Sequence, residues 1–303
     1  MTKVSRTHIH RSTGEKIGYF IIMLGLILFA FSTIYPIWHV IMYSFSDSKQ
    51  AMSGGLFFWP RGFSTLGYEM VMGTKQIWLS YVNSILTTII GTLISLALSI
   101  TCAYPLSRRR LHGKRIFSML FFITMLFSGG LIPTYIAVVN IGIANSFWAL
   151  VLPGCLSVYN MFILRNAMQI IPESLEESAK LEGANDFLIM ARIIVPLCTP
   201  SIAAVAMFYG IQHWNGYMNC LLYTTASDLQ VLPICLRQIL SGSATTTLSA
   251  SSNVSNMGAA AKVLTEETIK MTTVAVAVVP ILCVYPFLQR FYTKGVVAGA
   301  VKG

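Results

Sequence analysis

Long apolar stretches without a charged side chain alternate with short polar segments along this chain. The charge-free runs cover residues 17–46, 76–107, 116–164, 193–227 and 271–289. Because a helix of about 20 apolar residues crosses the hydrocarbon core of a bilayer, each run predicts a membrane-spanning helix, and the third run is long enough for two. The pattern therefore predicts an all-α integral membrane protein with six transmembrane helices.

Each expected span is long enough to cross a bilayer, and polar or turn-forming residues separate one span from the next. They lie at about 17–44, 77–106, 116–139, 146–166, 194–217 and 270–289. A hairpin at 140–145 separates the third span from the fourth, and prolines inside the spans predict bends that serve either packing or hinge motion. We find no repeat and no second domain, so residues 1–303 are expected to form one transmembrane domain.

The composition indicates a membrane protein, and the distribution of basic residues predicts its orientation in the membrane. Only 11% of residues are charged, against about 25% in soluble domains. Fifteen of the 21 lysines and arginines fall on the two ends of the chain and the second and fourth loops. Since basic loops stay in the cytoplasm, both termini are expected there, and the net charge of +10 reflects topology rather than a nucleic-acid partner. The N-terminal run is too long for a cleaved signal peptide and is expected to remain as the first span.

The polar segment 171–195 is unusual because it holds five of the eleven acidic residues between two long apolar runs. Pro172 suits the first position of a helix, where nearby carboxylates are favourable. Gly183 suits a left-handed C-terminal cap, and Asn185 or Asp186 suits the N-cap of a second helix. The segment therefore predicts a helix–turn–helix elbow at the cytoplasmic surface.

This elbow resembles the EAA loop of the permeases of ABC importers. The motif reads Glu177-Ser178-Ala179, then Gly183 four residues on, with Val195-Pro196 in the later position; Ser178 and Val195 depart mildly from the usual Ala and Leu. The stretch GANDF and the C-terminal sequence YPFLQRFYTKGVVAGAVKG resemble the carbohydrate (maltose-type) branch, and in particular the lipoprotein-dependent oligosaccharide permeases.

The resemblance implies the fold of a type I ABC-importer permease in a bacterial cell membrane, with each chain forming half of a translocation pathway that works by alternating access. It implies a paralogous permease as heterodimer partner, two ATPase subunits that bind ATP and Mg, an extracellular solute-binding lipoprotein, and contact with membrane lipid. The residues implied to couple the permease to the ATPase are Glu176, Glu177, Ser178, Ala179, Gly183, Ala184 and Asp186.

The sequence contains no residue pattern typical of an enzyme active site. The sequence has no phosphate-binding loop of the Gly-x-x-x-x-Gly-Lys-Ser/Thr type, no catalytic triad and no metal-ligand cluster, so we expect no enzyme activity, no cofactor and no metal. No Asp, Glu, Lys or Arg lies well inside a span, which favours a neutral solute and an external energy source. An importer of an amino acid, peptide or polyamine, or a self-sufficient channel, remains an alternative.

Polar side chains within the spans are candidates for a solute pathway. Amide groups can bind sugar hydroxyls, and an indole can stack on a sugar ring. The candidates are Gln212, His213, Trp214, Asn215, Tyr209 and Asn83. Such residues also pack helices together and anchor them at the membrane–water boundary, and this second interpretation stays open.

Overall fold

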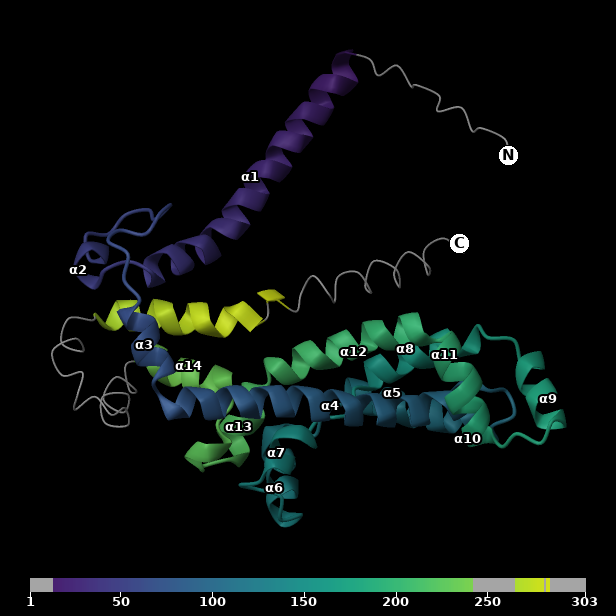
Figure 1. Cartoon of the computed structure of the whole chain (residues 1–303). Coiled ribbons are helices and arrows are strands. Elements are labelled where there is room, and N and C mark those ends of the chain that lie inside the picture. Colours follow the sequence, from purple (N-terminus) through teal and green to yellow (C-terminus); the bar gives the residue numbers. More distant parts are fainter. Residues whose placement is uncertain (1–12, 242–264, 281, 284–303) are drawn as a thin grey trace. The chain divides into compact units, whose positions relative to one another are not determined.

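The computed structural model describes residues 13–241, 265–280, 282 and 283. Within them every regular element is a helix, apart from an isolated β-bridge between Ser46 and Phe63 (Figure 1). The chain forms two compact units. The first holds the described residues up to Met70 and those at 265–275, and the second holds 71–241 and the described residues from Val276 on.

The first unit is built around one long apolar helix. It contains α1 (Thr13–Ser44), α2 (Ser48–Ala51), most of α3 (Leu66–Met72) and the first part of a helix at 266–280. The side chains of α1 are apolar on all sides and largely exposed, as expected of a helix whose solvent is lipid. Near its C-terminal end Tyr43 and Phe57 are buried with their ring centroids 5.0 Å apart, which fixes the following loop.

The second unit is arranged along α4 (Lys75–Ser107), which packs mainly against α12 and α8. The other elements are α5 (Lys114–Leu126), α6 (Leu131–Asn140), α7 (Phe147–Val151), α8 (Val158–Gln169), α9 (Ser174–Leu181), α10 (Asp186–Ile189), the π-helix η1 (Met190–Ile194), α11 (Val195–Leu197), α12 (Thr199–Trp214), α13 (Tyr217–Tyr223), the 3-10 helix η2 (Ser227–Leu229) and α14 (Leu232–Leu240). Figure 1 shows α9 and α10 at the end of this unit where α4 ends.

Small residues on one face of α4 let α12 approach closely. Gly91, Ser95 and Ser99 follow one another at intervals of four, and both serines are fully buried. The Ser95 Oγ and His213 Nε2 atoms lie 3.1 Å apart, and the hydroxyls of Ser99 and Tyr209 lie 2.6 Å apart. Where no water competes, small residues and interhelical hydrogen bonds of this kind are what hold membrane helices together.

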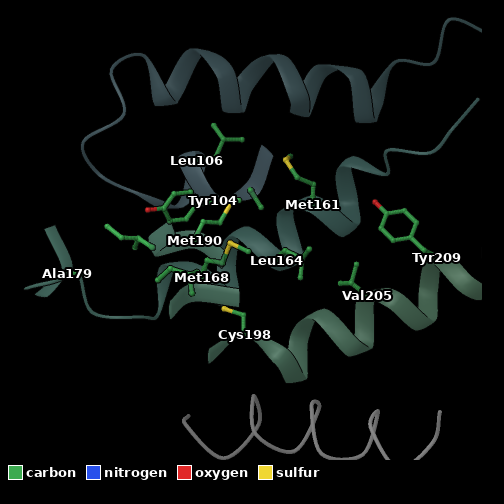
Figure 2. Packing of buried hydrophobic residues seen from close by; sticks show 13 residues of the cluster. Tyr104, Leu106, Met161, Leu164, Met168, Ala179, Met190, Cys198, Val205 and Tyr209 are labelled. Carbon is green, nitrogen blue, oxygen red and sulfur yellow. The ribbon is translucent and has the colours of Figure 1, made fainter. Parts of the chain in front are cut away.

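The apolar core of the second unit joins the end of α4 to the elbow. Thirteen buried residues from α4, α8, α9, α10, η1, α12 and the bend at Cys198 form one cluster, in which Ala179 lies at one end and Val205 and Tyr209 at the other (Figure 2). The elbow is therefore part of the packed structure rather than a free loop.

Two of the six predicted spans, 17–44 and 77–106, correspond within a few residues to the continuous helices α1 and α4. The segments expected as spans at 116–139, 146–166 and 194–217 are each interrupted in the structure. The first is bent by 112° at the break between α5 and α6, where Gly130 has a φ of +88°, and the third by 86° at Cys198, between two prolines. The second is interrupted at 152–157, where Gly154 has a φ of +77° after Pro153.

Two described helices are thus long and apolar enough to cross a membrane, or up to four if each bent pair counts as one span. The predicted hairpin at 140–145 is confirmed, since α6 ends at Asn140 and Asn145 takes a positive φ. The predicted sixth span, 270–289, is described only at 270–280, 282 and 283. The C-terminal sequence from Phe291 lies outside the described residues.

The contact between α4 and α12 gives a first prediction. A methyl group at Gly91 would lie 2.8 Å from the His213 ring, whereas one at Gly210 would meet nothing nearer than 3.8 Å. We expect Gly91→Ala to lower stability by about 1–3 kcal/mol, the usual cost of overpacking, and Gly210→Ala to be neutral or stabilising. Thermal unfolding of the detergent-solubilised protein measures this, and equal melting temperatures for the two variants would contradict the packing.

Candidate coupling elbow and polar residues of the helices

The first helix of the elbow is short and amphipathic. α9 runs from Ser174 to Leu181 with Glu173 at its N-cap position, so it begins two residues after Pro172, which was predicted as its first residue. Glu173 and Glu176 were predicted for its first turn; in the structure Glu176 lies there together with Glu177, and Glu173 is the N-cap residue. Acidic side chains at this end interact favourably with the helix dipole, which helps a helix of only eight residues to form.

Gly183 ends this helix in the predicted left-handed conformation, with a φ of +85°. The Gly183 N–H donates to the carbonyl of Lys180 (2.9 Å), and the Ala184 N–H donates to that of Ala179 (3.0 Å). These two bonds make a Schellman motif, which pairs the last carbonyls of the helix and turns the chain sharply. A residue with a Cβ would be strained at this position.

Asn185 begins the second helix. Its side-chain oxygen accepts a hydrogen bond from the Leu188 N–H at 2.8 Å, so Asn185, rather than Asp186, is the N-cap. The helical path continues through the π-helix η1 and α11 to the bend at Cys198. The elbow thus leads by continuous helical backbone to the base of α12.

The two faces of α9 differ in exposure. Glu176 and Ala179, three residues apart, are buried toward the core. Glu177 and Ser178 are exposed, and Leu181 is 91% exposed. The outer face of α9 therefore presents one apolar side chain among polar ones.

The inward face of α9 is fixed by a buried ion pair. The Arg108 Nε atom lies 2.6 Å from the Glu176 Oε1 atom, and the two side chains are only 3% and 6% exposed. Arg108 also donates through Nη1 to the carbonyl of Ile171 (3.3 Å), just before the elbow. Because an unpaired charge at such a site would be costly, this pair ties α9 to the end of α4.

A second ion pair holds the start of α10. Arg110 Nη2 lies 2.5 Å from Asp186 Oδ1, and Lys180 Nζ lies 3.1 Å from the same oxygen. Burial lowers the pKa of the Arg110 guanidinium, but the hydrogen bond and the charge of Asp186 outweigh it and raise the pKa above its ordinary value. These groups are more exposed than Arg108 and Glu176, so they add less to stability than the buried pair.

Sequence reasoning missed the roles of Arg108, Arg110 and Leu181. The basic run at 107–115 is typical of a cytoplasmic loop, and nothing local shows that two of its arginines pair with acids about 70 residues further on. Asp186 was expected to face a partner protein, yet in the structure its carboxylate is already paired within the chain.

The six polar residues predicted for a solute pathway fall into two groups. Tyr209 and His213 are buried against Ser99 and Ser95 of α4, and Tyr209 Oη also accepts a hydrogen bond from the Ser157 N–H at 3.1 Å. Their polar atoms are therefore used in packing between helices within this chain.

The other four are more accessible. Gln212 is exposed and donates to the Gly154 carbonyl (3.3 Å), Trp214 is half-buried and Asn215 is exposed. The half-buried Asn83 uses its amide to donate to the carbonyls of Asp228 (2.6 Å) and Gln230 (3.0 Å). Gln212, Trp214 and Asn215 thus form a local group at the C-terminal end of α12, and Asn83 holds a neighbouring loop.

The buried ion pair gives a second prediction. Glu176→Gln leaves the Arg108 charge without its counterion, so we expect a loss of about 3–5 kcal/mol of stability. The matched control is Glu177→Gln on the exposed face of the same helix, which should change stability by less than about 0.5 kcal/mol.

Thermal unfolding of the purified protein measures both variants. Replacing Arg108 and Glu176 together by Met should restore much of the loss, because no charge is then left unpaired. Equal effects of Glu176→Gln and Glu177→Gln would show that the pair does not hold the elbow.

The chain matches known transport proteins over most of its length. Residues 77–297 match the family model for the binding-protein-dependent transport system inner membrane component. The polygalacturonan/rhamnogalacturonan transport system permease protein YtcP of Bacillus subtilis (strain 168) is 41% identical over 278 residues, covering 92% of this chain and 96% of that protein. Protein LplC of the same organism is 37% identical over 271 residues, covering 89% of this chain and 90% of LplC.

A solved structure shares the fold. A chain of a bacterial ABC transporter involved in the import of the acidic polysaccharide alginate superposes with a TM-score of 0.85 at 26% identity, covering 94% of this chain and 99% of that one. The EAA-like elbow, the long α4 and these matches agree. The chain belongs to the family of binding-protein-dependent transport system inner membrane components, the membrane permeases of ABC importers.

Proposed function

We propose that this permease carries a carbohydrate, most simply an oligosaccharide, across the membrane by alternating access, with energy from a separate ATPase. The observation that carries the proposal is the elbow, a stiff α9 with an exposed outer face and a buried ion pair that ties it to α4. A permease has no nucleotide site of its own and must receive motion from outside. ATP and Mg therefore belong to the partner ATPase.

The proposed topology has six spans and both termini in the cytoplasm. The described part of the chain supports this orientation, because Arg108, Arg110, Arg165 and Lys180 all belong to the loops and helices at the elbow. Basic residues gathered at one end of membrane helices mark the cytoplasmic side. The bent pairs α5–α6 and α10–α12 then count as spans three and five.

In the proposed mechanism, the outer face of α9 docks on the ATPase. Leu181 is the apolar anchor, and Glu177 and Ser178 contribute polar contacts beside it. Displacement of α9 passes along the chain to α8 and, through α10 and η1, to α12. The Arg108–Glu176 pair passes it directly to α4 as well. Three packed helices then move together to change which side of the pathway is open.

The substrate class rests on the relatives. YtcP is named for polygalacturonan and rhamnogalacturonan, and the structural neighbour for alginate, which are all polysaccharides. Of the polar candidates, we propose Gln212, Trp214 and Asn215 as substrate contacts, since they are accessible and combine amides with an indole. Tyr209, His213 and Asn83 would support the pathway by positioning helices and loops.

The proposed assembly contains a paralogous permease as heterodimer partner, two ATPase subunits and an extracellular solute-binding lipoprotein. The name of the family, binding-protein-dependent transport, supports a binding protein in this assembly. The same architecture with an amino acid, peptide or polyamine as solute is the second candidate. The binding protein decides between them because it selects the solute.

A third prediction tests the assembly. We expect the tagged chain, purified in mild detergent from its native membrane, to bring with it a second permease, an ATPase and a lipoprotein. That lipoprotein should bind acidic or neutral oligosaccharides when tested by calorimetry, and not amino acids or polyamines. A reproducible homo-oligomer without an ATPase would instead support a self-sufficient channel.

A fourth prediction tests coupling at the elbow. Gly183 and Gly142 both have a positive φ, and nothing lies within 4 Å of a Cβ added to either. Valine at either site should cost about 1–2 kcal/mol of local strain, but only Gly183 lies in the elbow. In proteoliposomes with all subunits, Gly183→Val should hydrolyse ATP with little uptake, whereas Gly142→Val should retain uptake. Normal uptake by Gly183→Val would refute the coupling role.

A further inference from the structure

A pocket of about 570 Å³ lies between the C-terminal end of α4 and the start of α10. Its lining includes Thr101, Tyr104 and Arg108 at the end of α4, Arg110 in the loop that follows, and Asp186 and Phe187 of α10. None of these residues is among the candidates for coupling or transport apart from Asp186. The function proposed above uses Arg108 only through its ion pair with Glu176 and assigns no ligand to the pocket.

The pocket has buried polar groups at its floor, and Arg110, His112 and Asp186 at its rim. Tyr104 and Arg108 are buried, and the Tyr104 hydroxyl and Arg108 Nη2 have no hydrogen-bond partner in the part of the chain that the structure describes. Arg110 and His112 are exposed beside them. Buried donors without acceptors are unfavourable, so the floor favours a ligand that brings acceptor oxygens.

The pocket is expected to lie at the boundary between the membrane and water. α4 has 33 residues and is therefore about 50 Å long, longer than the hydrocarbon core of about 30 Å. Its last turns, which line the pocket, thus extend toward the head groups on the side of the elbow. A ligand here meets both lipid and water.

One face of α4, which is mostly apolar, extends from the membrane-spanning part of the helix to the pocket. Ile94, Leu98, Thr101 and Pro105 follow one another at intervals of four, three and four, so they share one face of α4. Leu98, Thr101 and Pro105 are exposed, and Ile94 is half-buried. Phe187, which is 70% exposed, adds an apolar wall across from α4. This face suits an acyl chain whose head group lies at the basic rim.

We infer that this pocket binds the phosphate head group of an anionic phospholipid, with one acyl chain along the Ile94–Pro105 face of α4. The phosphate oxygens lie at Arg110 and His112, above the unpaired donors of Tyr104 and Arg108. Basic pockets at the cytoplasmic ends of membrane helices are common sites for such head groups. The bound lipid joins α4 to α10 beside the Arg110–Asp186 pair.

Native mass spectrometry of the transporter purified with its partner subunits tests this site. The probes are phosphatidylglycerol, phosphatidylcholine and inorganic phosphate. We expect one phosphatidylglycerol to be retained over phosphatidylcholine, and Arg110→Ala to reduce that retention about fivefold, the effect of one basic side chain near an anionic lipid. Arg109→Ala is the matched control, because Arg109 is the adjacent exposed arginine and does not line the pocket.

Two further variants separate binding from a structural effect. Thr101→Phe fills the pocket without changing its charge and should abolish selective retention. Asp186→Asn removes the carboxylate that competes for Arg110, so retention should stay equal or increase, although an ion pair is lost.

Three results would overturn the assignment. Retention that is unselective, or that falls equally in Arg109→Ala, would show that no defined site exists. Loss of retention in Asp186→Asn would show that Arg110→Ala acts through folding. Complete displacement of the lipid by millimolar inorganic phosphate would assign the pocket to a free phosphate compound instead.

Discussion

The buried pair of Arg108 and Glu176 is the interaction on which the arrangement of the elbow depends. α9 has only eight residues, too few to be stable alone, and Ala179 is its one buried apolar side chain. The ion pair at 2.6 Å adds a close, buried electrostatic contact with the end of α4. Without it the helix would have little to hold it against the rest of the chain.

This constraint explains how a surface element can act on helices inside a membrane. α9 is joined to α8 and α12 through the backbone and to α4 through the ion pair. α4 in turn contacts α12 through small residues and the Ser95–His213 and Ser99–Tyr209 hydrogen bonds. Close packing of this kind transmits displacement because it deforms little. The chain can therefore respond to a push on α9 as a unit.

Some features of the fold and of the elbow could be predicted from the sequence, because they depend on local residue patterns, and others could not. The turn at Gly183 was predictable, because a glycine between two helical patterns has one common role. The breaks at 127–130 and 152–157 were not recognised, although Gly129-Gly130 and Pro153-Gly154 occur there. An apolar run shows that a segment is soluble in lipid but not that its backbone is continuous. The Arg108–Glu176 pair was beyond prediction, since it depends on tertiary packing between residues far apart in sequence.

The most direct test of the account is whether the elbow and the end of α4 move as one body. Spin labels at Ser174 and Arg109, both exposed, report the distance within that body, and labels at Ser174 and Ile141 report movement of the elbow against the hairpin after α6. In the assembled transporter, pulsed electron spin resonance with and without trapped nucleotide should show an unchanged first distance and a changed second one. A first distance that changes as much as the second would contradict the account.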